Sequence, residues 1–154
     1  MRNIPLDNDP KYVVIHTAAA ANEDNVPVYQ PASVIRDYHR SKGWLDIGYH
    51  YYIEKDGRIV PGRAELARGA HCVDLGMNRK SIGICCAGHG DFADFLPAQY
   101  ASLYDLIVSI CQRFSVTVCD VVGHRETGAP KTCPGNRVDM QKIREEVARR
   151  MKDA

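Results

Sequence analysis

Two histidines and one cysteine are the residues of this sequence best suited to hold a metal ion. His16 ends the apolar run VVIH, and His124 ends a second run of the same character, VVGH. Cys133 follows nine residues after His124, in the sequence APKTCPG. Two imidazoles and one thiolate suit Zn²⁺ and leave a fourth position open, as in catalytic zinc sites. Spacing alone leaves the alternative that each is a hydrogen-bonded residue of the core.

Two strands would bring these side chains together. Residues 12–16 form a short β-branched run, and residues 116–122 form another that continues into Gly123 and His124. In an open α/β sheet, functional groups gather in the crevice beyond the strand ends. If the two strands are parallel neighbours, both imidazoles can reach one point. The sequence therefore predicts a metal site at one edge of a sheet.

The rest of the chain alternates between strand and helix patterns. Apolar residues spaced three and four apart predict helices over 31–42, 97–114 and 140–151. Strands are predicted over 48–53, 59–60 and 81–87, with a turn at 55–58 that joins the first two into a hairpin, and irregular chain over 63–77. We expect an α/β fold with a central mixed β-sheet covered by helices. We expect one catalytic domain over residues 1–154, with about the first ten as an N-terminal extension.

Composition limits the classes of partner. The 154 residues carry 20 Lys and Arg against 19 Asp and Glu, so the net charge of +1 favours neither nucleic acid nor anionic lipid. No apolar run has the length of a signal peptide or a membrane span, so we expect a protein made in the cytoplasm. We also expect it to be a monomer. The six cysteines are expected to stay reduced, because three of them lie inside apolar patterns and no secretion signal is visible.

Seven segments carry a family resemblance, and they follow one another from residue 13 to residue 135. They are VVIHTAA (13–19), HRSKGWLDIGYHYYIEKDGRIVPGR (39–63), GAHC (69–72), NRKSIGIC (78–85), FLPAQYASL (95–103), GHRE (123–126) and PKTCPG (130–135). With them the chain resembles the T7-lysozyme-like and peptidoglycan-recognition-protein family of zinc N-acetylmuramoyl-L-alanine amidases. Lys131, two residues before the cysteine, is typical of the phage-lysozyme branch.

The resemblance implies roles for individual residues. His16, His124 and Cys133 match the family's ligands for one zinc ion. Tyr49 in GYHY and Lys131 in KTCPG match its active-site tyrosine and lysine. Two further positions fall where relatives line the peptide-binding groove: His71 and Asn78.

The implied function is zinc-dependent hydrolysis of the amide bond between N-acetylmuramic acid and L-alanine in peptidoglycan. Such an enzyme would act on the cell wall after its release, as an endolysin does, with muropeptide as its ligand. Family members that only bind peptidoglycan typically lack the cysteine ligand, and the related anhydromuropeptide recycling amidases use Asp in its place, so Cys133 favours the lytic amidase over both alternatives. No HExxH motif supplies a general base. Either Tyr49 acting through water or zinc-bound hydroxide unaided could fill that role.

Overall fold

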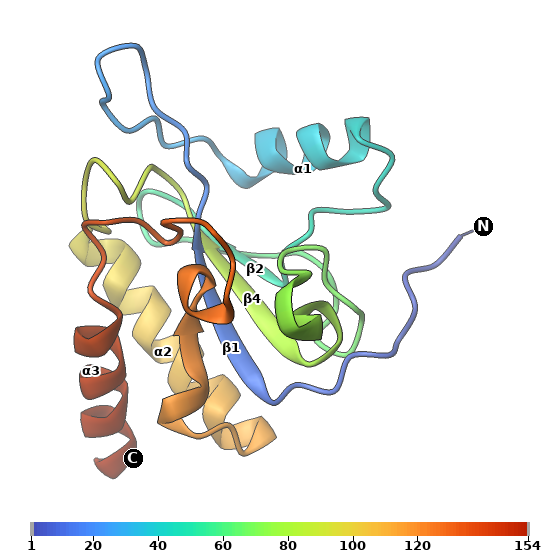
Figure 1. The fold of residues 1–154 in the computed structure, drawn as a ribbon, viewed down its shortest axis with the longest axis vertical. Helices are drawn as coiled ribbons and strands as arrows, with labels where there is room; N and C mark the ends of the chain where they lie inside the picture. Colours follow the sequence, from blue (N-terminus) through green and yellow to red (C-terminus); the bar gives the residue numbers. More distant parts are fainter. Residues whose placement is uncertain (1, 154) are drawn as a thin grey trace.

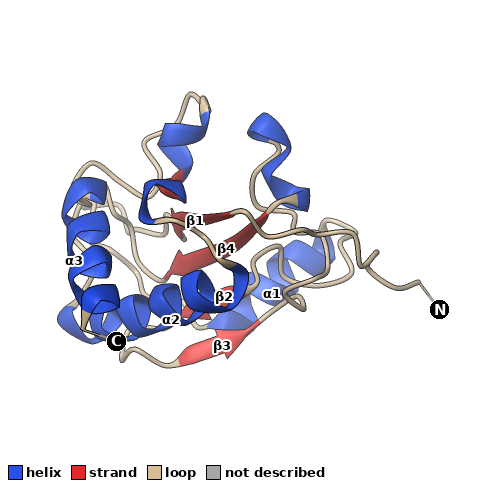
Figure 2. Ribbon diagram, turned by 90° about the horizontal axis from the view of Figure 1, so that it is seen from below, coloured by secondary structure: helices blue, strands red, loops and turns tan. Residues whose placement is uncertain are grey.

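A five-stranded sheet with the strand order β3-β2-β4-β1-β5 forms the middle of the protein. The computed structural model describes residues 2–153. The strands are β1 (Tyr12–Thr17), β2 (Tyr51–Ile53), β3 (Ile59–Pro61), β4 (Ser81–Cys86) and β5 (Val121–Gly123). Only the β2–β3 hairpin is antiparallel, so the predicted mixed sheet is confirmed. Figure 2 shows β1, β4, β2 and β3 following one another across the sheet.

The two faces of the sheet carry different layers. Helices α2 (Pro97–Phe114) and α3 (Met140–Lys152) lie side by side in Figure 1 and share one core with Val13 and Ile15 of β1. The opposite face receives α1 (Ala32–Ser41) and the segment 62–80, which includes the 3₁₀ helix η1 (Asp74–Arg79). Alternate residues of a strand face opposite sides. Burial of Val13 and Ile15 against α2 and α3 therefore turns His16 to the other face.

This alternation fixes the register of β1. Val13 and Ile15 are fully buried, and burial of such a side chain is worth about 1.5–3 kcal/mol. A slip of one residue would exchange these two side chains for Val14 and His16. The core thus determines which face of the sheet receives the first candidate ligand.

Three predicted helices are observed within one or two residues of their expected bounds, and the helix over 97–114 is matched at both ends. The predicted strands over 48–53 and 116–122 were too long. The chain at Tyr49 and His50 hydrogen-bonds through its carbonyls to residues 62 and 63 and joins β4 as a regular strand only from Tyr51. Residues 118–120 form the 3₁₀ helix η2 (Val118–Asp120), and pairing with β1 begins at Val121.

The N-terminal residues pack against the domain. The buried Asn8 side chain donates to the carbonyls of Glu65 and Ser81, at 2.7 and 2.9 Å. The backbone of Asp9 donates to the carbonyl of Arg79. Among residues 2–153, no helix is long and apolar enough to cross a membrane.

Candidate metal centre

The sheet brings the two candidate histidines together at its edge. Strands β1 and β5 are parallel neighbours, with Ile15 opposite Gly123, so His16 and His124 are the next residues of each strand. The 3₁₀ helix η3 (His124–Thr127) begins at this point and turns the chain away. The two imidazole rings are 4.7 Å apart between centroids and are 2% and 5% exposed. The predicted convergence of the two strand ends is therefore observed.

Cys133 reaches the same point on a loop, residues 129–138, which is called here the cysteine loop. Gly135, at φ +123°, packs directly on the backbone of Gly90, and a side chain on either glycine would collide with the other loop. Arg125 fastens the loop from the other side. Its guanidinium donates to the carbonyls of Gly135 and Val138 at 2.6 and 2.7 Å and to that of Thr132 at 3.3 Å.

The three potential ligand atoms fit a zinc ion. One atom each from His16, His124 and Cys133 lies within 4.8 Å of the other two. His16 Nδ1 and Cys133 Sγ are 3.7 Å apart. Two such ligands on a tetrahedral zinc would be about 3.6 Å apart, given the usual Zn–N and Zn–S bond lengths. The backbone N–H of Thr17 also donates to Cys133 Sγ at 3.4 Å, as would suit a thiolate.

The electrostatics of the centre keep the imidazoles neutral. Burial lowers the pKa of His16 well below its ordinary value, and the nearby charges of His124 and Lys131 lower it further. Burial and Lys131 also lower the pKa of His124. Burial raises the pKa of the Cys133 thiol to about 11, although Thr17, Lys131 and Arg125 oppose that rise. Neutral imidazoles are ready ligands, whereas the thiol must lose its proton when a metal binds.

Each histidine also has a partner at its second ring nitrogen. His16 Nε2 lies 2.8 Å from His71 Nδ1, and His124 Nε2 lies 3.6 Å from the Asp74 carboxylate. Such outer partners orient metal-binding imidazoles. No sequence motif pointed to Asp74, and His71 was predicted to line the peptide-binding groove. Both belong to the segment 62–80, which had no predicted regular structure to place them.

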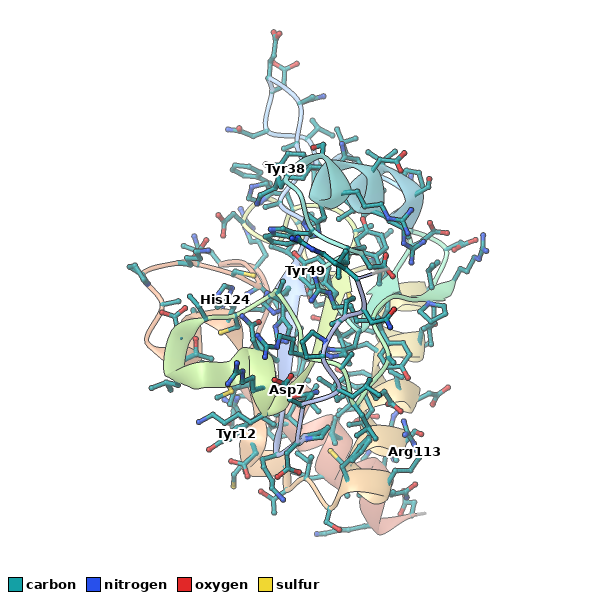
Figure 3. The ribbon with its side chains drawn as sticks, turned by 90° about the vertical axis from the view of Figure 1, so that its right-hand side faces the viewer. Asp7, Tyr12, Tyr38, Tyr49, Arg113 and His124 are labelled. Atoms are coloured by element: carbon teal, nitrogen blue, oxygen red, sulfur yellow. The ribbon has the colours of Figure 1, made fainter. Side chains whose placement is uncertain are left out.

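Tyr49 and Lys131 both lie near this cluster. The Tyr49 ring is 5.2 Å from the His16 ring between centroids, and Figure 3 shows Tyr49 and His124 near the middle of one face. Burial raises the pKa of Tyr49 well above its ordinary value, and nearby Cys85 and Cys133 add to the shift. The Lys131 side chain is exposed at the mouth of a cavity that His124 also lines.

That cavity, of about 310 Å³, is called here the groove. It is lined by Trp44, residues 70–74, Asn78, His124 and Lys131. Asn78 Oδ1 accepts hydrogen bonds from the backbone N–H groups of His71 and Cys72, at 2.8 and 2.9 Å, and so shapes the groove wall. Half-buried Trp44 packs its ring on His39.

Comparison with known proteins gives one consistent family. A family model described as N-acetylmuramoyl-L-alanine amidase matches residues 6–136. The endolysin of Escherichia phage T7 is 39% identical over 127 residues, which cover 79% of this chain and 78% of that protein. Peptidoglycan-recognition protein SC2 of Drosophila melanogaster is 32% identical over 136 residues, 86% of this chain and 72% of that protein. The structure of N-acetylmuramoyl-L-alanine amidase LysC from Clostridium intestinale URNW matches with a TM-score of 0.82 at 28% identity, covering 96% of this chain and 91% of that one.

Proposed function

This chain belongs to the N-acetylmuramoyl-L-alanine amidase family and is an enzyme, and we propose that it is a zinc hydrolase of peptidoglycan. The bond cleaved joins N-acetylmuramic acid to L-alanine, and His16, His124 and Cys133 hold one zinc ion per chain. The observation that carries the proposal is the convergence of these three ligand atoms, with a His16-to-Cys133 separation that matches a tetrahedral site. Zinc at this point would polarise the amide carbonyl and activate water as the nucleophile.

Tyr49 and Lys131 act on the charge that develops at the carbonyl oxygen. A tyrosine whose pKa is raised stays protonated near neutral pH, which suits the hydroxyl of Tyr49 to donating a hydrogen bond and disfavours it as a general base. The Lys131 ammonium supplies a second donor at the mouth of the groove. Donors fixed in advance at an oxyanion are worth about 3–4 kcal/mol each.

The groove is where the stem peptide binds in this proposal. Asn78 forms part of its wall through the backbone that it holds, and His71 lines it. In this proposal the chain acts as a monomer, and it reaches the cell wall after release from the cytoplasm. The name endolysin of its phage T7 relative supports lytic action on the wall. The presence of Cys133 supports catalysis over a recognition module that binds muropeptide without cutting it.

The test is to incubate the purified protein with muropeptides and identify the products by mass spectrometry. We expect a free stem peptide that begins with L-alanine. Its release should stop with a chelator and return with added zinc. Cys133→Ala should abolish both turnover and bound zinc, whereas Cys119→Ala, at an exposed cysteine outside the site, should change neither.

Two outcomes would contradict the proposal in different ways. Intact muropeptides that nevertheless bind the protein would favour the recognition module. Cleavage that is unaffected by chelation and by Cys133→Ala would leave an amidase but remove zinc from it.

A further inference from the structure

The ring of His71, a residue that lines the groove, packs closely on the backbone of two glycines. A side chain at Gly69 or at Gly83 would collide with the His71 ring. Gly83 lies inside β4, where glycine is less favourable than alanine. A glycine inside a strand often marks a site where another group approaches the backbone closely. The ring of His71 is that group.

Both ring nitrogens of His71 are occupied by groups of the protein itself. Nδ1 lies 2.8 Å from His16 Nε2, and Nε2 lies 3.2 Å from Ser81 Oγ. The Ser81 hydroxyl in turn donates to the carbonyl of Met77 at 2.7 Å. Thus neither ring nitrogen of His71 is left free to bind a substrate.

These contacts determine where each proton lies. A serine hydroxyl has one proton, and that of Ser81 is used on Met77, so toward His71 the hydroxyl can only accept. His71 Nε2 must then carry a proton. In a neutral imidazole the other nitrogen is an acceptor, so His71 Nδ1 accepts from His16 Nε2–H. The remaining nitrogen of His16, Nδ1, is left with a free lone pair, and it is this atom that faces Cys133 Sγ.

We infer that His71 and Ser81 are positioning residues that select the metal-binding tautomer of His16. A series of hydrogen bonds links the Met77 carbonyl, the Ser81 hydroxyl, His71 and His16. It runs from the segment 62–80 across β4 to β1, and it directs the lone pair of His16 Nδ1 at the metal position. The inference rests on the proposed zinc site. It replaces the predicted contact between His71 and substrate.

Two measurements test the inference, and neither depends on activity. The first is NMR of ¹⁵N-histidine-labelled wild-type protein without metal. We expect His16 and His71 both to carry their proton on Nε2. A proton on His71 Nδ1 would overturn the inference, because His16 Nε2 would then be an acceptor and His16 Nδ1 would be protonated.

The second measurement is zinc affinity by competition with a chromophoric chelator. We expect His71→Leu to weaken zinc binding by about 10–100-fold, the usual range for loss of an outer partner, and Ser81→Ala to weaken it by about tenfold. His71→Gln should keep most of the affinity, since its amide can accept from His16 and donate to Ser81. The matched control is His50→Gln. The His50 ring packs against His71, and within residues 2–153 it hydrogen-bonds only to Ala67 O and Gly83 N. Its loss should therefore leave zinc affinity unchanged.

The outcomes separate this inference from the proposed function. If the wild-type protein binds no zinc, the proposed function fails. If it binds zinc and Ser81→Ala and His71→Leu match the His50→Gln control, the zinc site stands and the positioning role is wrong. Should His71→Leu fail to fold, Ser81→Ala and the NMR tautomers still decide the question.

Discussion

Replacement of Arg125 by methionine should weaken both the fold and the metal centre. The substitution keeps the apolar stem of the side chain but removes the guanidinium, which donates to the carbonyls of Gly135 and Val138 at 2.6 and 2.7 Å. Hydrogen bonds to charged groups contribute about 1.5–3 kcal/mol each when sheltered. Two such bonds would contribute about 3–6 kcal/mol. Because Arg125 is partly exposed, water will replace part of this contribution, and we expect the free energy of unfolding to fall by about 2–3 kcal/mol, at or just below the low end of that range.

For a chain of this size that loss corresponds to a fall in Tm of about 4–12 °C. The freed carbonyls lie on the cysteine loop, so the position of Cys133 becomes less fixed, and we expect zinc affinity to fall by about tenfold or more. Thermal unfolding of the metal-free protein measures the first effect, and chelator competition measures the second.

Arg137→Met is the matched control. Arg137 lies on the same loop and is exposed, and within residues 2–153 its side chain makes no hydrogen bond or ion pair. The reasoning is refuted if the Arg125 and Arg137 variants have the same Tm and the same zinc affinity. A lower Tm with unchanged zinc affinity would show that the loop holds Cys133 without Arg125.

Two further predictions concern charge. Burial lowers the pKa of His50 below its ordinary value of 6.5. Below pH 6.5 the unfolded chain therefore binds a proton that the folded chain does not, and the free energy of unfolding falls as the pH falls. The contribution of this one group is at most about 1.4 kcal/mol per pH unit. Urea unfolding of His50→Gln between pH 6.5 and 5 should therefore show a shallower loss than wild type, and equal slopes would contradict the assignment. Lys131→Met should lower kcat by about 10²–10³-fold without lowering zinc affinity. The Lys131 ammonium lowers the pKa of His16 and His124, so its charge disfavours a second cation at this position. Loss of bound zinc together with activity would mean that Lys131 instead maintains the site.

Local patterns in the sequence were enough to predict the helices, the candidate ligands and the family. The helix over 97–114 was predicted at both ends because its apolar spacing begins after Leu96-Pro97 and ends near Phe114. The three candidate metal ligands were predicted because each coincides with a local signal: an apolar run ending in His16, another ending in His124, and a turn-forming sequence around Cys133. Seven segments, among them PKTCPG and the one that contains GWLDIGYHYYI, carried the family resemblance. The comparisons confirm the family.

Tertiary structure alone decided what surrounds those ligands. The partners of His16 and His124 are Asp74, His71 and, through His71, Ser81. These partners lie far from the two histidines in sequence, and no local periodicity connects them. The shortened strand at Val121 has the same cause, since β-branched residues at 116 and 118 favour a strand but only Val121–Gly123 lie beside β1. Local propensity fixes which residues can form a strand or hold a metal. Pairing between distant strands decides which backbone groups form hydrogen bonds, and packing across the sheet decides which nitrogen of His16 faces Cys133.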